Sequence, residues 1–142
     1  PFQMVISKGN SAWGINRSKS GGELWFGCFG VDLREGQDGN LCGTIDVHDG
    51  KWHHVVGIYD GMRACLYIDG VLDVSSEASG SIDANNWSVL IGANEETITD
   101  AKWRSYFCFD GLIDDVRVYD YALPEAEIKN LHEERVSVQR EN

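Results

Sequence analysis

The residues best suited to binding chemistry lie in the polar stretch 93–106, where aromatic rings stand beside carboxylates, an amide and cationic groups. Pyranose rings offer apolar C–H faces that lie on aromatic rings, while nearby carboxylates and amides fix the hydroxyl groups. A tryptophan in a long polar loop has little packing reason to exist, so Trp103 is the leading candidate for such a contact. The predicted ligand-binding residues are Trp103, Tyr106, Asn94, Glu95 and Arg104.

The other tryptophans allow different interpretations. Trp13 and Trp25 are further candidates for stacking on a sugar, but together with Trp52 they are predicted to serve the core. Trp87 follows Asn85-Asn86 at the entry to a predicted strand and fits either role.

Residue types that could perform catalysis are present, but their spacing does not suit it. His53 and His54 are adjacent, and neighbours on a strand point to opposite faces, so one metal ion cannot easily take both. A retaining glycosidase needs two carboxyl groups about 5–5.5 Å apart. Glu95-Glu96 and Asp114-Asp115 are consecutive instead, which aims their side chains apart in an extended backbone. Because Glu-x-Asp-x-x-Glu and Gly-x-Ser-x-Gly motifs are also absent from the sequence, we predict a non-catalytic protein.

The elements that position these residues are short strands separated by glycine-rich turns. The centre is the stretch 52–70, in which two runs rich in β-branched and aromatic residues flank Asp60-Gly61, and Asp69-Gly70 closes the second run. Asp-Gly occurs five times among 16 glycines and only 2 prolines, a density of turn signals typical of an antiparallel sandwich. Strands are predicted at 4–6, 13–16, 24–31, 41–47, 52–59, 64–68, 71–74, 89–91, 106–109 and 112–119.

One helix is expected near the C-terminus. Pro124 suits a first helical turn, and Ile128 and Leu131 share a face that can dock on the sandwich. The helix is predicted to end near Glu134. Residues 136–139 alternate like a strand, but their charged surroundings predict a frayed tail.

Several motifs follow one another in a recognisable order. They are WHHVV at 52–56, YDG at 59–61, LYIDG at 66–70, LIG at 90–92, FDGLIDDVRVY at 109–119 and ALP at 122–124. This order resembles that of laminin-G-like, concanavalin A-like jelly-roll domains over residues 3–131. The resemblance implies an all-β fold, a two-sheet antiparallel jelly-roll β-sandwich with one short C-terminal helix, formed by residues 1–135 and followed by a tail at 136–142. That architecture hosts lectins, carbohydrate-binding modules, adhesion modules and a few hydrolases, so function has to be argued from the site.

The resemblance also implies an incomplete sheet. Domains of this family carry further strands before the equivalent of residues 2–8, and these N-terminal strands are missing here. An unpaired sheet edge invites pairing with another chain. We therefore expect a homodimer or strand exchange.

Asp114 is the residue for which the resemblance implies a metal. On a strand it would share the inward face of Val116 and Val118, and a buried carboxylate has to be paired with donors or with a cation. Similar jelly rolls often hold a structural Ca²⁺ through acidic side chains and backbone carbonyls. The preferred alternative is a carboxylate capped by backbone N–H groups near Asp110-Gly111. No other cofactor is expected.

The four cysteines are Cys28, Cys42, Cys65 and Cys108, and their spacing argues against a zinc knuckle or a redox pair. Cys28 with Cys42 could bridge neighbouring strands, and Cys65 could face Cys108. Buried free thiols are the alternative, and both interpretations stay open.

The formal net charge of −11 limits the partners. A field of this sign repels phosphate backbones and anionic membranes, so we expect no binding to nucleic acid. No run approaches the ~18 apolar residues of a membrane-spanning helix, so we expect no membrane insertion either. The resemblance implies an extracellular or cell-surface location, although no signal peptide is visible.

The sequence therefore predicts a non-catalytic carbohydrate-binding module, with carbohydrate or glycoprotein as its partner. The alternative is a structural or adhesion module that contacts proteins without binding glycan.

Overall fold

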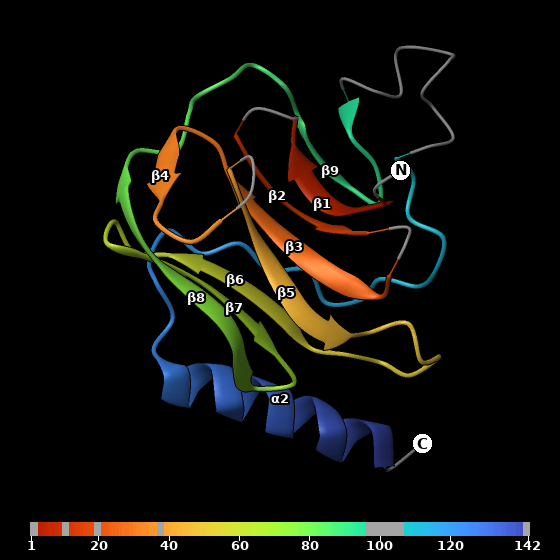
Figure 1. The fold of residues 1–142 in the computed structure, drawn as a ribbon. Coiled ribbons are helices and arrows are strands. Elements are labelled where there is room, and N and C mark those ends of the chain that lie inside the picture. The colour runs from red at the N-terminus through yellow and green to blue at the C-terminus, as the bar shows by residue number, and fades with distance from the viewer. Residues whose placement is uncertain (1–2, 10–11, 19–20, 37–38, 96–106, 141–142) are drawn as a thin grey trace.

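The computed structural model describes residues 3–9, 12–18, 21–36, 39–95 and 107–140. This part of the chain forms two β-sheets and a C-terminal helix, α2 (Glu125–Arg140), as can be followed in Figure 1. One sheet has five strands in the order β5-β3-β2-β1-β9, and the other has four in the order β4-β8-β7-β6. Neighbouring strands pair antiparallel throughout, which confirms the predicted jelly-roll sandwich.

The strand bounds follow the predicted runs closely in most places. The five-stranded sheet consists of β1 (Gln3–Lys8), β2 (Trp13–Arg17), β3 (Glu23–Cys28), β5 (Asn40–Asp46) and β9 (Val89–Ile91). The four-stranded sheet consists of β4 (Val31–Leu33), β6 (Val55–Tyr59), β7 (Arg63–Ile68) and β8 (Val71–Gly80). The last of these runs past the predicted end at residue 74, because its second half pairs with the unpredicted strand β4.

The core lies between the two sheets and depends on the period of two in β3. Leu24, Phe26 and Cys28 alternate into the core, where they join Leu41 of β5 and Leu66 of β7 in one buried cluster. The residues between them face away from the core. This second face of the five-stranded sheet carries the site described below.

The hairpins around β7 form as the Asp-Gly signals predict. Asp60 Oδ1 accepts hydrogen bonds from the backbone N–H groups of Met62 (2.8 Å) and Arg63 (2.6 Å), which closes the first turn. At the second turn Asp69 and Gly70 both have positive φ, 53° and 76°. Aspartate and glycine tolerate this left-handed conformation better than most residues, so the turn can be tight.

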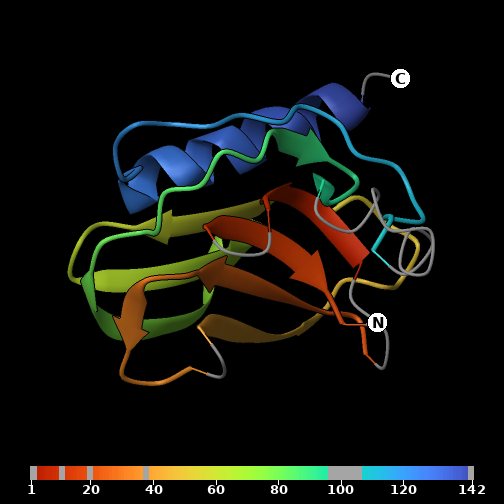
Figure 2. The same ribbon diagram turned by 90° about the horizontal axis from the view of Figure 1, so that it is seen from above.

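Helix α2 packs on the four-stranded sheet (Figure 1, Figure 2). Ile128 is completely buried and clusters with Tyr67 of β7 and with Leu131. The predictions that the helix ends near Glu134 and that a frayed tail follows are wrong, because the helix continues to Arg140. Val136 follows Ile128 by eight residues, which is about two helical turns, and is half-buried. The helical spacing of apolar residues therefore prevails over the strand-like alternation of residues 136–139. No helix in the described part of the chain has the length and apolar character needed to cross a membrane.

Residues 112–119 do not form the predicted strand. Asp115 has a φ of 52°, which interrupts an extended run, and its carboxylate pairs with Arg117 and with Arg135 of α2. Val116 and Val118 are exposed, and so is Asp114. The prediction that Asp114 lies on an inward strand face is therefore wrong.

Cys28 and Cys65 are free thiols. Cys28 points into the core, where burial raises the pKa of its thiol to about 12. Cys42 pairs with Trp25, one of the residues on the opposite face of the sheet. Because the two side chains leave the sheet on different faces, no disulfide can join them without a backbone rearrangement.

Candidate functional site

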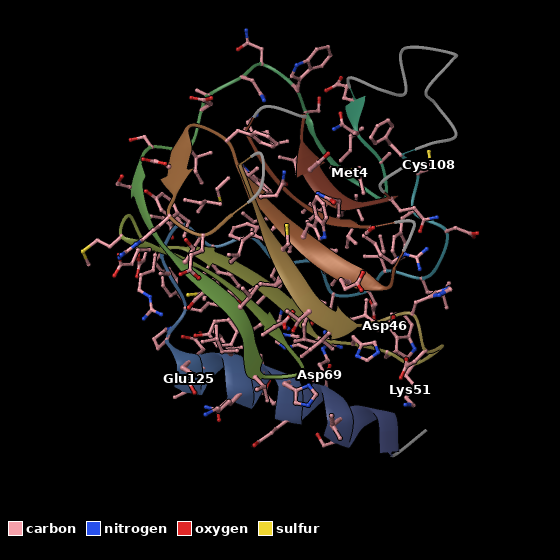
Figure 3. All side chains as sticks on the ribbon, in the orientation of Figure 1. Met4, Asp46, Lys51, Asp69, Cys108 and Glu125 are labelled. Atoms are coloured by element: carbon pink, nitrogen blue, oxygen red, sulfur yellow. The ribbon has the colours of Figure 1, made fainter. Side chains whose placement is uncertain are left out.

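A cavity of about 330 Å³ lies on the face of the five-stranded sheet that points away from the core. Its apolar lining consists of Met4, Trp13, Trp25, Phe29 and Phe107. Met4 also forms an isolated β-bridge with Cys108, which brings the segment after residue 106 to the start of β1 (Figure 3). Residues far apart in the sequence therefore meet around one cavity.

The cavity has its shape because small and large residues alternate on neighbouring strands. In and just after β3, Trp25, Gly27 and Phe29 follow one another at a spacing of two and share one face. Gly27 lies opposite Gly14 of β2 in the strand register. The two glycines contribute no side chain of their own, and Asn40 and Phe29 pack close over Gly27.

Asn16 supplies an unusual polar group to this cavity. It lies opposite Trp25 in the register and is only 8% exposed. Its Oδ1 has no hydrogen-bond partner among the residues that the structure describes. A buried acceptor without a donor costs about 1–3 kcal/mol. Because this oxygen is closed to solvent, a ligand hydroxyl reaches it only if the Asn16 side chain turns toward the cavity.

The adjacent buried amide behaves differently. Gln3 is also 8% exposed, but its Oε1 accepts hydrogen bonds from Arg17 Nε (3.1 Å) and Nη2 (2.6 Å). Gln3 and Arg17 form the row next to Met4 and Asn16, so their side chains leave the sheet on the other face. Arg17 therefore cannot donate to Asn16 as it does to Gln3.

The tryptophans of the sheet do not serve the core as predicted. Trp13 and Trp25 are half-buried, belong to neither core cluster and line the cavity. Trp52 is 52% exposed, so its assignment to the core is also wrong. The period of two in residues 24–29 could have predicted that Trp25 points to the other face of the sheet from Leu24 and Phe26.

The preferred binding loop falls mostly outside the described residues. Trp103, Tyr106 and Arg104 all lie in the stretch 96–106, outside the part of the chain that the structure describes. Asn94 is fully buried, and Glu95 is half-buried and accepts a hydrogen bond from the backbone N–H of Ser88. The described part of the loop thus places neither Asn94 nor Glu95 in the lining of the cavity.

The adjacent histidines contact different groups. His53 is held between two carboxylates, with Nδ1 2.8 Å from Asp69 Oδ2 and Nε2 2.9 Å from Asp49 Oδ1. Burial opposes the charge on His53, but the hydrogen bonds to the two carboxylates outweigh it and raise its pKa. The ring of His54 instead faces His132 of α2, with 6.0 Å between ring centroids.

Asp114, the residue predicted to hold calcium, is exposed. Its Oδ1 accepts a hydrogen bond from the backbone N–H of Asp115, whose own carboxylate is paired with arginines. Nowhere in the described ranges do three His, Cys, Asp or Glu side chains come together in a way that could hold a metal ion. Calcium binding remains a prediction from the resemblance.

The comparison with solved structures points to a known fold. The chain is similar to the S-layer domain-containing protein (residues 221–444) from Clostridium thermocellum ATCC 27405, with 24% sequence identity and a TM-score of 0.51. The similarity covers 92% of this chain and 63% of that one, so the chain spans less than two thirds of its length. At this identity the likeness concerns the fold alone.

The sequence comparisons give the family. No curated protein matches the chain. The family model described as the concanavalin A-like lectin/glucanases superfamily matches residues 2–129. Because this match spans nearly the whole chain and agrees with the two-sheet fold, the chain belongs to the concanavalin A-like lectin/glucanase superfamily and is a laminin-G-like domain.

Proposed function

We propose that this domain is a non-catalytic carbohydrate-binding module that takes a sugar in the cavity of the five-stranded sheet. The observation that carries the proposal is the combination of aromatic rings with an unpaired buried amide oxygen at one cavity. Aromatic rings suit the apolar faces of a pyranose, and the oxygen of Asn16 can accept a hydrogen bond from a hydroxyl group. An extracellular or cell-surface location is part of the proposal.

The absence of a catalytic role is proposed from the composition of the site. None of the described residues that line the cavity carries a carboxyl, imidazole or thiol group. Glycoside hydrolysis through an acid and a nucleophile requires two carboxyl groups at the scissile bond. The lining therefore supports binding and offers no described group that could transfer a proton.

The test is a glycan array run with and without calcium, followed by titration of each hit with two tryptophan variants. Trp25→Ala removes an aromatic ring from the cavity, whereas Trp52→Ala removes an exposed ring outside it. Loss of roughly 1.5 kcal/mol of aromatic contact corresponds to about a tenfold weaker affinity. We expect this loss for Trp25→Ala and unchanged affinity for Trp52→Ala.

Several outcomes would count against the proposal. Equal loss in both variants would indicate a general structural effect. Unchanged affinity in Trp25→Ala, with its fold intact by circular dichroism, would place the sugar elsewhere. Binding that requires calcium would support the predicted Ca²⁺, and Asp114→Asn would then test whether that residue holds it.

A competing function is a structural or adhesion module that contacts proteins. Exposed apolar side chains favour it, namely Val89 and Ile91 of β9 together with Val116 and Val118. Exposed apolar side chains of this kind can serve a protein contact where they lie close together. A glycan array without hits under either calcium condition would support this function over sugar binding.

A further inference from the structure

We infer that the cavity selects uncharged sugar rings and rejects acidic ones, an inference that rests on the proposed function. It follows from two features of the described residues: their part of the lining carries no charged side chain, and it contains a buried acceptor at Asn16. Each feature bears on the difference between a hydroxyl and a carboxylate on the same ring.

The first feature is the charge around the ligand. The described lining combines apolar side chains, glycines and the amides of Asn16 and Asn40, and it contains no cationic group. Burial of a carboxylate without a cation or several donors is costly. The net charge of −11 adds a repulsive field at longer range. A uronic acid would thus lose its hydration without a charged partner in the described lining.

The second feature is the direction of the hydrogen bond at Asn16. Its Oδ1 is an acceptor, and it is buried without a donor from the described residues. A sugar hydroxyl can donate to this oxygen, but an ionised carboxylate offers only acceptors. Replacing the hydroxyl that reaches Asn16 by a carboxylate would therefore bring two acceptors together.

The packing around Gly27 concerns the size of the ligand and not its charge. An added Cβ at Gly27 would lie 2.9 Å from Asn40 Oδ1 and 3.2 Å from Phe29 Cε2, both of which belong to lining residues. A methyl group there would push on these two side chains and so change the shape of the cavity. The volume of about 330 Å³ lies at the lower end for ligand pockets, so we expect a ligand contact of one or two rings.

The decisive experiment compares matched neutral and acidic oligosaccharides on the unmodified protein. Three pairs share ring stereochemistry and linkage: β-1,4-mannan and β-1,4-mannuronan oligomers, cello-oligosaccharides and their C6-oxidised glucuronan counterparts, and galacturonan oligomers with their carboxyl-reduced forms. Isothermal titration gives each affinity. We expect at least one neutral member to bind about tenfold or more tightly than its acidic counterpart. The preference should persist in high salt, where the Debye length is about 3 Å, because the desolvation cost is local.

The outcomes separate this inference from the function on which it rests. Equal or tighter binding of the acidic members would overturn the inference and leave carbohydrate binding intact. A preference that disappears in high salt would also overturn it, since long-range repulsion would then explain the result. Failure of all sugars, including the hits of a wider array, would overturn both.

A steric variant gives an independent check. Gly27→Ala should abolish binding of the neutral oligomer while the far-ultraviolet circular dichroism spectrum stays unchanged. Gly111→Ala is the matched control, because this glycine is exposed and does not line the cavity. Full binding by folded Gly27→Ala would contradict a ligand that contacts Phe29 and Asn40 beside Gly27.

Discussion

Replacement of Asn16 by leucine should make the protein more stable and unable to bind its ligand. The two side chains have similar branched shapes, and Asn16 is 92% buried, being 8% exposed. Removal of an unpaired buried acceptor recovers a desolvation cost of about 1–3 kcal/mol. For a domain of this size, each kcal/mol corresponds to roughly 2–4 °C in Tm.

The matched control is Gln3→Met on the neighbouring strand. Gln3 has the same exposure as Asn16, but Arg17 donates two hydrogen bonds to its oxygen. Hydrogen bonds to charged groups contribute about 1.5–3 kcal/mol, so Gln3→Met should lower Tm. If Asn16→Leu raises Tm while Gln3→Met lowers it, Asn16 lowers the stability of the fold in favour of binding.

The assay is differential scanning calorimetry together with titration of the tightest neutral oligosaccharide. A lower Tm for Asn16→Leu would show that the oxygen is satisfied in solution, and the reasoning would fail. Retained affinity in a stabilised variant would show that the oxygen does not contact the ligand. Either result would remove the main support for the proposed site.

Three further predictions concern the scaffold. The folded-state pKa of His53 is raised above its ordinary value of 6.5, so protonated His53 stabilises the fold at lower pH, and this contribution is lost as pH rises through the folded-state pKa. His53→Gln should therefore make the free energy of unfolding depend less on pH above 6.5. Urea unfolding at several pH values measures this. Ile128→Ala should lower the free energy of unfolding by about 2–5 kcal/mol, because the side chain is completely buried between α2 and the four-stranded sheet. A decrease of less than about 1 kcal/mol in urea unfolding would contradict the docking of α2 on that sheet. Among the described residues no strand pairs with the outer edge of β6. This edge should support a dimer at micromolar concentration, and a monomeric mass in solution scattering would count against it.

The turns and strands of this chain were largely predictable because their signals are local. The Asp-Gly corners at 60–61 and 69–70 form the hairpins as expected, and positive φ values at Asp69 and Gly70 show why these residue types occur there. The run at 24–31 also forms a strand, β3, at its expected place. Backbone preference and turn chemistry act within a few residues, so they can be read without knowledge of the partners.

The assignment of faces was harder because both faces of β3 are apolar. Leu24 and Phe26 alternate with Trp25 and Phe29, and either set could have faced the core. A hydrophobic pattern specifies the buried face only when the other face is polar. The misplacement of Trp13 and Trp25 has the same origin, since an aromatic residue on a strand suits a core and a binding surface equally.

By itself the sequence determined the jelly-roll family, the hairpins and the period of two, because each depends on residues close together in the chain. The tertiary structure alone decided that Met4, Asn16, Trp25 and Phe107 surround one cavity, because strand register and sheet order bring them together. It also decided that 112–119 is no strand, where the paired carboxylate of Asp115 and its positive φ outweigh the local β preference. These features depend on contacts between residues far apart in the sequence, so a local sequence pattern cannot predict them.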